Sequence, residues 1–200
     1  MKISNFGLFG TLEALLFCGI TEVGPMLDRR TLPHLQPVTA GRYRAAMGSF
    51  ATGVAVVTSE WGGTFHGMTI SSLASVSLDP CLLLVCLKKN SRTGDAIRAR
   101  RAMAVNLLRH GQEALARRFV DTLGDRFDGL ETAVDEAGMP LLPGCIAHLS
   151  CRLIEVYPGG DHDIFIAQVA SCAAVEGAPL VYHRGGFGGY APAAPQPTPV

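Results

Sequence analysis

Short apolar segments rich in β-branched residues recur along the middle of this chain, with turn residues between them. Such segments are typical of buried strands. We expect strands at residues 54–58, 65–71, 81–87, 102–108, 147–157, 164–175 and 180–183. Short helices are favoured only at residues 42–50, 93–101 and 111–120, without the regular spacing of βαβ units. The pattern predicts a mainly β fold with peripheral helices, in which an antiparallel barrel carries helices at its rim.

The size and charge of the chain limit what it can bind. Its 200 residues, 48% of them hydrophobic, allow one sizeable core. Seventeen Lys and Arg balance seventeen Asp and Glu, so the basic excess needed for nucleic acid or an anionic membrane is missing. No apolar run approaches the roughly 20 residues that a bilayer span needs. We therefore expect no nucleic-acid partner and no membrane association.

Both ends of the chain differ in composition from its middle. We expect residues 1–40 to form an N-terminal extension, residues 41–190 the folded domain, and residues 191–200 a Pro-rich disordered tail. Lys2 and the apolar residues after it resemble a secretory signal, but Glu13 interrupts the pattern and no small-residue cleavage site follows. An alternative start at Met26 would leave the folded domain unchanged.

The cysteine pattern argues for a reducing compartment. The six cysteines never form a C-x-x-C pair, and five lie within or beside apolar segments. We therefore expect buried, reduced thiols in a cytoplasmic protein, with neither a disulfide framework nor a zinc site. Sequence signatures of dinucleotide folds, phosphate-binding loops and hydrolases are also missing from the chain.

The first of three polar stretches that could carry chemistry is residues 67–80. Hydroxyl side chains recur there at Thr69, Ser71, Ser75 and Ser77, with Ser72 breaking the period. One interpretation is a half-exposed edge strand, where Ser and Thr are ordinary residues. The other is a row of small donors against which a flat polar ligand lies, because small side chains let a ring approach the backbone.

The second stretch is residues 88–93, which follow a buried strand and begin a short helix. Ser91 or Thr93 at a helix start is first of all a capping residue. The same position presents backbone N–H groups and the positive end of the helix dipole, close to Lys88, Lys89 and Arg92. That combination suits a phosphate group.

The third stretch is residues 157–163, a turn between two strands. A solvated hairpin is the simplest interpretation, and a functional His162 with its ring oriented by neighbouring groups is the alternative. A metal held by Asp161, His162 and Asp163 is disfavoured, because adjacent strand residues point to opposite faces and do not converge on one ion.

The order of these pieces resembles the flavin reductase family of small NAD(P)H:flavin oxidoreductases, the reductase components of two-component flavin-dependent monooxygenases. The resemblance spans roughly Tyr43 to Gly189. It rests on the segments Phe50–Thr58, His66–Ser72, Ser75–Pro80, Asn90–Thr93, Ala104–Leu108, Ala116–Phe119, Gly160–His162 and Pro179–His183. Two departures are Cys81, where the family often has a second proline, and a looser Gly-rich ending at residues 185–189.

The resemblance implies a split β-barrel that binds FMN or FAD, uses NADH or NADPH, and forms a homodimer. It places the isoalloxazine ring along Thr69, Ile70, Ser71 and Ser72, with Ser75 and Ser77 beside it. It assigns the ribityl phosphate to Asn90, Ser91 and Thr93, and the nicotinamide to His162. The reduced flavin would then serve a partner monooxygenase.

Two alternative functions remain open at the level of sequence. One is a flavin-carrying electron-transfer or storage protein without NAD(P)H turnover, and the other is a non-catalytic barrel scaffold. The lack of a clear basic cluster for a 2′-phosphate favours NADH over NADPH.

Overall fold

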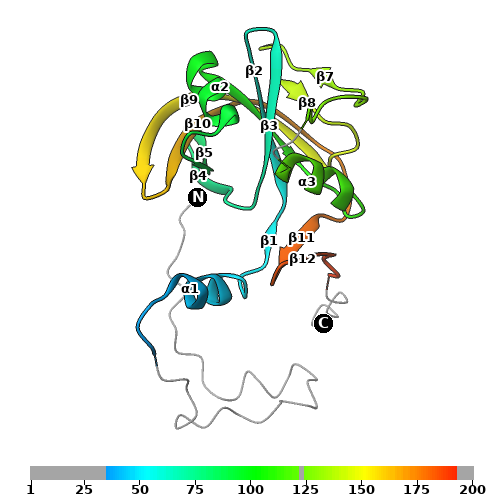
Figure 1. Ribbon diagram of the computed structural model, residues 1–200. Coiled ribbons are helices and arrows are strands. Elements are labelled where there is room, and N and C mark those ends of the chain that lie inside the picture. The colour runs from blue at the N-terminus through cyan, green and yellow to red at the C-terminus, as the bar shows by residue number, and fades with distance from the viewer. Residues whose placement is uncertain (1–34, 122–123, 193–200) are drawn as a thin grey trace, which may run out of the picture. The chain divides into compact units, whose positions relative to one another are not determined.

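The computed structural model describes residues 35–121 and 124–192. Residues from Ala40 onward form one compact unit, which Figure 1 shows as a ribbon. The predictions for the start at Met26 and Cys18, and for all of the N-terminal extension and Pro-rich tail except residues 35–40 and 191–192, concern residues outside those described. Within the described parts of the chain, no helix is long and apolar enough to cross a bilayer.

The mainly β class with peripheral helices is confirmed, and the predicted strands appear with small shifts in their ends. The helices are α1 (Ala40–Met47), α2 (Arg92–Arg100) and α3 (Glu113–Val120). The longer strands are β2 (Ala55–Trp61), β3 (Thr64–Ile70), β4 (Ala74–Leu78), β5 (Cys81–Lys88), β6 (Ala102–Leu107), β9 (Ala147–Gly159) and β10 (His162–Ala174). The short strands are β1 (Thr52–Gly53), β7 (Ala133–Val134), β8 (Pro140–Leu141), β11 (Leu180–His183) and β12 (Gly186–Gly189).

Seven antiparallel strands form the main sheet, in the order β3-β2-β6-β9-β10-β5-β4. Its two edge strands, β3 and β4, are joined by only residues 71–73. The first polar stretch therefore lies on both edges and on the link between them, so the edge-strand interpretation describes its backbone correctly. Alternate residues of β5, such as Leu83, Val85 and Leu87, point into the core, as the period of a strand requires.

A second apolar cluster lies between α3 and the strands beside it. Ala116 and Phe119 of α3 are fully buried there, together with Val56 and Leu180. Figure 1 shows α3 beside β3, and Gly67 of β3 explains this close approach. A Cβ atom at Gly67 would lie 2.6 Å from the Phe119 ring, so the strand needs a glycine where the helix packs.

The hairpin of β9 and β10 is longer than the sequence predicts. The turn was expected at residues 158–162, yet Pro158 and Gly159 belong to β9, and His162 begins β10. β9 pairs with β6 only up to Arg152, so its outer edge is unpaired near Pro158. A proline that lacks an N–H is tolerated on such an edge.

Two further expectations are corrected by the structure. The ordered strands do not end at His183, because β12 pairs with β11. All five described cysteines are free thiols, and Cys145 and Cys151 are buried as expected. The expectation of burial is wrong for Cys81 and Cys172, which are exposed because each lies near an end of its strand: Cys81 is the first residue of β5, and Cys172 lies in the exposed last five residues of β10.

Candidate functional site

The three polar stretches meet at the carboxyl end of β5. The Ser72 hydroxyl donates to the carbonyl of Cys86 at 2.9 Å and accepts from the Cys86 N–H at 3.1 Å. Two residues further along the strand, Lys88 pairs with His162 of β10. Residues 90–93 follow directly after β5. Positions far apart in the sequence therefore form one continuous polar region.

The second stretch caps α2, as its first interpretation predicted. The Gly94 N–H donates to the Ser91 hydroxyl at 3.3 Å, which makes Ser91 the N-cap. Asn90 has a φ of 59°, a left-handed conformation in which Asn is common, and it turns the chain out of β5. Thr93 is only 2% exposed, so this helix start is well packed.

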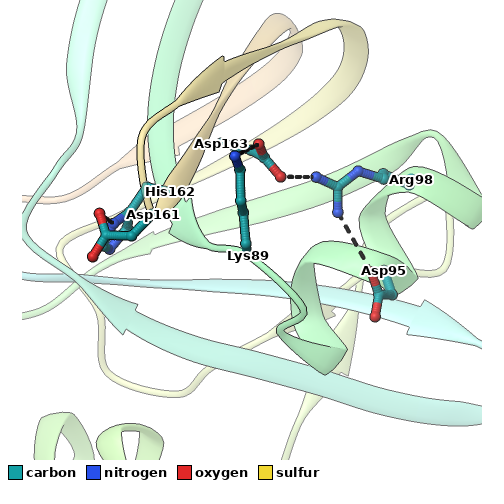
Figure 2. A network of polar contacts seen from close by, with 6 residues as sticks. All are labelled: Lys89, Asp95, Arg98, Asp161, His162 and Asp163. Carbon is teal, nitrogen blue, oxygen red and sulfur yellow. Dashed lines mark hydrogen bonds and ion pairs between the residues drawn. The ribbon is translucent and has the colours of Figure 1, made fainter.

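The third stretch is attached to α2 through a network of charged side chains, shown in Figure 2. The Asp163 carboxylate pairs with Arg98 of α2 and lies 4.0 Å from the Lys89 ammonium group. The Lys89 N–H donates to the Asp161 carbonyl at 3.1 Å. Because Asp163 is only 14% exposed, these contacts hold the hairpin against the segment that carries Asn90 and Ser91.

The His162 ring is exposed and oriented by its neighbour. His162 Nδ1 lies 2.8 Å from the Asp161 Oδ1 atom, and 44% of the His162 side chain is accessible. That hydrogen bond from His162, together with the charge of its ring, lowers the pKa of Asp161. Nδ1 is thus occupied by Asp161, which leaves Nε2 to face a ligand.

Two hollows lie along the edge of the sheet and share Ser71, Tyr182 and Gly185. The smaller, of about 520 Å³, is lined by Thr69, Ile70 and Ser71 of the first stretch and by α3 residues. The larger, of about 1120 Å³, lies between Ser71, Ser72 and α1. Together they form what we call the edge groove, which has more than enough room for a flat, drug-sized ligand.

The edge groove contains residues that the sequence analysis did not single out as site residues. Tyr182 and Phe187 form an aromatic wall with ring centroids 5.3 Å apart. The Arg117 guanidinium lies 5.1 Å above the Phe187 ring, and Arg184 lines the larger hollow. Tyr182 falls within a segment that carries the family resemblance, whereas the roles of Arg117 and Phe187 depend on contacts between distant parts of the chain.

Two predicted site residues lie apart from the edge groove. Ser75 and Ser77 lie on β4 opposite Leu83 and Leu82, near the start of β5 rather than its end. The Ser77 hydroxyl accepts the Asp79 N–H at 3.2 Å. Neither serine lines one of the two hollows.

The hydroxyls of the first stretch do not form one uniform row. The Thr69 hydroxyl donates to the Ala116 carbonyl at 2.7 Å, and the Ser72 hydroxyl is occupied by Cys86. Ser71 is exposed and faces both hollows. The donors left for a ligand are therefore the Ser71 hydroxyl and the backbone of this segment.

The residues of the edge groove fit a flavin. Aromatic side chains and small residues leave room for a flat ring, and Ser71 supplies a hydrogen-bonding group. The Thr52 hydroxyl oxygen, which lines the larger hollow, is buried without a hydrogen-bond partner. A buried hydroxyl with no partner costs free energy, so a polar atom of a ligand would stabilise this wall.

The fold and the groove define a mainly β barrel whose candidate site suits a flat ring and a phosphate group. The sequence model of one protein family, the flavin reductase like domain, matches residues 47–191 of this chain. The chain therefore belongs to the flavin reductase family.

Relatives and solved structures agree with this assignment. The reductase component of the 4-nitrophenol 4-monooxygenase/4-nitrocatechol 2-monooxygenase of Rhodococcus opacus is 37% identical, over 79% of this chain and 85% of its own length. The FMN reductase (NADH) SmoA of Agrobacterium fabrum is 38% identical, over 73% of this chain and 83% of its own length. The NADH:FAD oxidoreductase of Streptomyces globisporus, solved in complex with NAD and FAD fragments, is 36% identical, with a TM-score of 0.77 over 82% of this chain and 100% of that one.

Proposed function

We propose that this protein is an NADH-dependent flavin reductase, which reduces FMN or FAD by hydride transfer and supplies the reduced flavin to a partner monooxygenase. The names of the relatives and the family support this function. The observation that carries it is the meeting of Ser72, residues 90–93 and His162 at the end of β5, beside the edge groove. One continuous surface then holds a ring, a phosphate and a nicotinamide.

We assign the ring position to Thr69, Ile70, Ser71 and Ser72, without Ser75 and Ser77, which lie apart from the edge groove. Because the Thr69 and Ser72 hydroxyls are used within the protein, those residues fix the backbone. Ser71 and the backbone of the segment provide the hydrogen bonds to the ring. Donors aimed at the ring stabilise the negative charge that it gains on reduction. A bound flavin would supply the two-electron acceptor, which no side chain of the protein can replace.

We assign the flavin phosphate to the segment of Asn90, Ser91 and Thr93. The start of α2 presents the positive end of its dipole, which favours an anion. The Ser91 cap and the left-handed Asn90 give this segment its shape before a ligand arrives. A preformed segment loses little conformational entropy on binding.

We assign His162 to orienting the nicotinamide of NADH. The bond from Nδ1 to Asp161 fixes the ring orientation, so Nε2 is presented in a constant direction. Hydride passes directly between the two cofactors, and the protein contributes by orienting the nicotinamide ring against the flavin ring. We therefore assign no obligatory proton transfer to His162.

A turnover assay tests the proposed function. The protein is mixed with FMN or FAD and with NADH or NADPH, and the absorbance at 340 nm is followed. We expect consumption of NADH that depends on added flavin and exceeds the rate with NADPH. A yellow protein without turnover would support a flavin carrier, and a colourless inactive protein would support a scaffold. Either result would refute the reductase function.

We propose that the protein works in the cytoplasm as a homodimer, and the exposed apolar residues of the barrel support the dimer. Tyr43 and Phe50 at α1 are exposed, although both are large and apolar, and Phe50 is 67% accessible. Leu78 of β4 is more exposed still, at 86%. Exposed apolar groups of this size are typical of surfaces that another subunit covers. Sedimentation velocity of the wild type and of Phe50→Asp tests this, because the charge should shift the protein towards monomer.

A further inference from the structure

The larger hollow of the edge groove has more space than a flavin ring needs. It measures about 1120 Å³ and adjoins the smaller hollow of about 520 Å³, which Thr69, Ile70 and Ser71 line. A drug-sized ligand occupies a site of about 300 to 1000 Å³. A second ligand can therefore lie beside the flavin, on the side of the groove that α1 forms.

Two basic side chains line the larger hollow. They are Arg44 of α1 and Arg184, which follows β11, and none of the described residues that line this hollow is acidic. The chain as a whole carries equal numbers of basic and acidic residues, so this is a local excess of positive charge. Guanidinium groups match the oxygens of a phosphate group, so the hollow favours an anionic part of a ligand.

Arg184 is held in place and still has hydrogen-bond donors for a ligand. Its backbone N–H donates to the Gly48 carbonyl at 2.9 Å, which ties the turn between β11 and β12 to the end of α1. Its Nη2 atom contacts the Ser49 hydroxyl at 3.4 Å, a long hydrogen bond. A guanidinium group carries five N–H donors, so most of them remain for an anion. A side chain positioned in advance loses little entropy on binding.

A hydroxyl group in the same hollow also lacks a partner. Thr52 of β1 pairs with Tyr182 of β11, which lies two residues before Arg184. The Thr52 Oγ1 atom is buried and has no hydrogen-bond partner among the described residues. A phosphate oxygen in the hollow would accept a hydrogen bond from this hydroxyl and remove the cost of its burial.

The phosphate of the flavin is assigned to another part of the site. The proposed function places it, including the flavin phosphate that FAD carries within its diphosphate, at residues 90–93, which do not line the larger hollow. The other phosphoryl groups of the reaction belong to NADH, in a diphosphate that one ribose separates from the nicotinamide. The anion that remains for Arg44 and Arg184 is therefore this diphosphate.

The larger hollow also lies within reach of the nicotinamide position at His162. Ser72 lines the hollow, and its hydroxyl donates to the carbonyl of Cys86 on β5. Lys88, two residues further along β5, pairs with His162. Two strand residues span about 7 Å. The ribose of NADH bridges a gap of this order, so a nicotinamide at His162 leaves the diphosphate at the larger hollow.

We propose that the larger hollow binds the diphosphate of NADH, with Arg184 and Arg44 as the residues that hold it. This inference rests on the proposed function and gives the second cofactor a position beyond His162. The two arginines supply the charge, and Thr52 supplies a neutral hydrogen bond. These residues bind and orient the pyridine dinucleotide and take no part in hydride transfer.

Steady-state kinetics of Arg184→Gln and Arg44→Gln test the proposal, because each variant removes one charge and keeps a polar side chain. We expect each to raise KM for NADH about tenfold, with little change in kcat and with KM for FMN and FAD unchanged. Arg184→Lys should retain part of the affinity. Arg42→Gln is the matched control, since Arg42 lies on the same helix but does not line the larger hollow.

Binding to the flavin-free protein gives a second readout that does not depend on turnover. Isothermal titration calorimetry uses ADP-ribose, which carries the diphosphate of NADH without its nicotinamide. We expect the Kd for ADP-ribose to rise in Arg184→Gln by about the same factor as KM for NADH. Sedimentation velocity of each variant should match that of the wild type, so that a lost dimer is not mistaken for a lost ligand contact.

Several results would overturn the inference. Equal increases in KM for FMN and NADH would show that Arg184 has only a structural role. An increase for FAD alone would assign the hollow to the diphosphate of the flavin, and an increase for NADPH alone would assign it to a 2′-phosphate. Unchanged constants, or a wild type that does not bind ADP-ribose at millimolar concentration, would refute the proposal.

Two further outcomes are kept apart from these. If Arg184→Gln does not fold, Arg44→Gln decides, because Arg44 lies at an exposed position of α1. Failure of the proposed function looks different, since the wild type would then consume no NADH with either flavin.

Discussion

Arg98 of α2 donates a hydrogen bond to the carboxylate of Asp163 on β10, 65 positions away in the sequence. The Arg98 guanidinium also lies 4.8 Å above the Phe165 ring, and Phe165 is buried in the core. The pair therefore anchors both α2 and the hairpin that carries His162 to the same part of the sheet, as Figure 2 shows. We infer that Arg98 and Asp163 are positioning residues, which set the separation between the phosphate segment and His162.

Asp163→Asn should weaken that anchor and loosen the hairpin. We expect a loss of roughly 1 to 3 kcal/mol in the free energy of unfolding, because the pair is partly buried. KM for NADH should rise several-fold while kcat falls less. Steady-state kinetics and urea unfolding measure both effects. Asp95→Asn is the control, since Asp95 binds Arg98 from within the same helix. Equal effects of the two variants on KM would refute a role for the hairpin.

His162→Ala should raise KM for NADH more than it lowers kcat, because an orienting residue contributes mainly to binding of the nicotinamide. His183→Ala, at an exposed position on β11, provides the matched control. Initial rates over a range of NADH concentrations give both constants. A collapse of kcat at unchanged KM would instead mean that His162 takes part in the chemical step.

Gly67→Ala should destabilise the protein, because its Cβ would lie 2.6 Å from a ring carbon of the buried Phe119. Overpacking of this kind costs about 1–3 kcal/mol. Gly188→Ala has open space around its Cβ and should change stability by much less. Denaturant unfolding of both variants compares them, and similar midpoints would show that α3 can move away from β3 without cost.

The described cysteines should react with thiol reagents at very different rates. Burial raises the pKa of the Cys145 and Cys151 thiols to about 12, so almost no thiolate forms near neutral pH. Cys81 and Cys172 are exposed and should be alkylated first. Peptide mapping after a short treatment with iodoacetamide at pH 8 gives the order of labelling. Faster labelling of Cys145 than of Cys81 would contradict the structure.

The two buried thiols also predict how stability depends on pH. Their pKa values are raised above the ordinary value of 9.0, so the folded state favours the protonated thiol. Their contribution to stability is complete below about pH 9 and is lost as the pH rises from about 9 to about 12. Urea unfolding between pH 8 and pH 11 should show this loss, and Cys145→Ala should reduce it. Stability that increases over this range would contradict the burial.

Most of the strands could be predicted because hydrophobic periodicity reports local burial. The apolar segments at residues 54–58 and 81–87 became β2 and β5 with small changes at their ends. The length of the β9–β10 hairpin could not be predicted, because Pro158 looks like a turn residue in the sequence. It is tolerated within β9 because the pairing of β6 with β9 ends at Arg152, well before Pro158. The exposure of Cys81 and Cys172 was missed because apolar neighbours do not reveal where a strand runs out beyond the packed core.

The sequence by itself determined the kinds of residue available: hydroxyls at residues 69–77, a capped helix start at Ser91, and a histidine in a tight turn at residue 162. Local patterns are sufficient for such assignments, because caps and turns depend on neighbouring residues. Only the tertiary structure decided that Ser72, Thr93 and His162 gather at one end of β5, while Ser75 and Ser77 do not. That gathering depends on which strands pair and in which register, and these pairings join residues that are far apart in the chain.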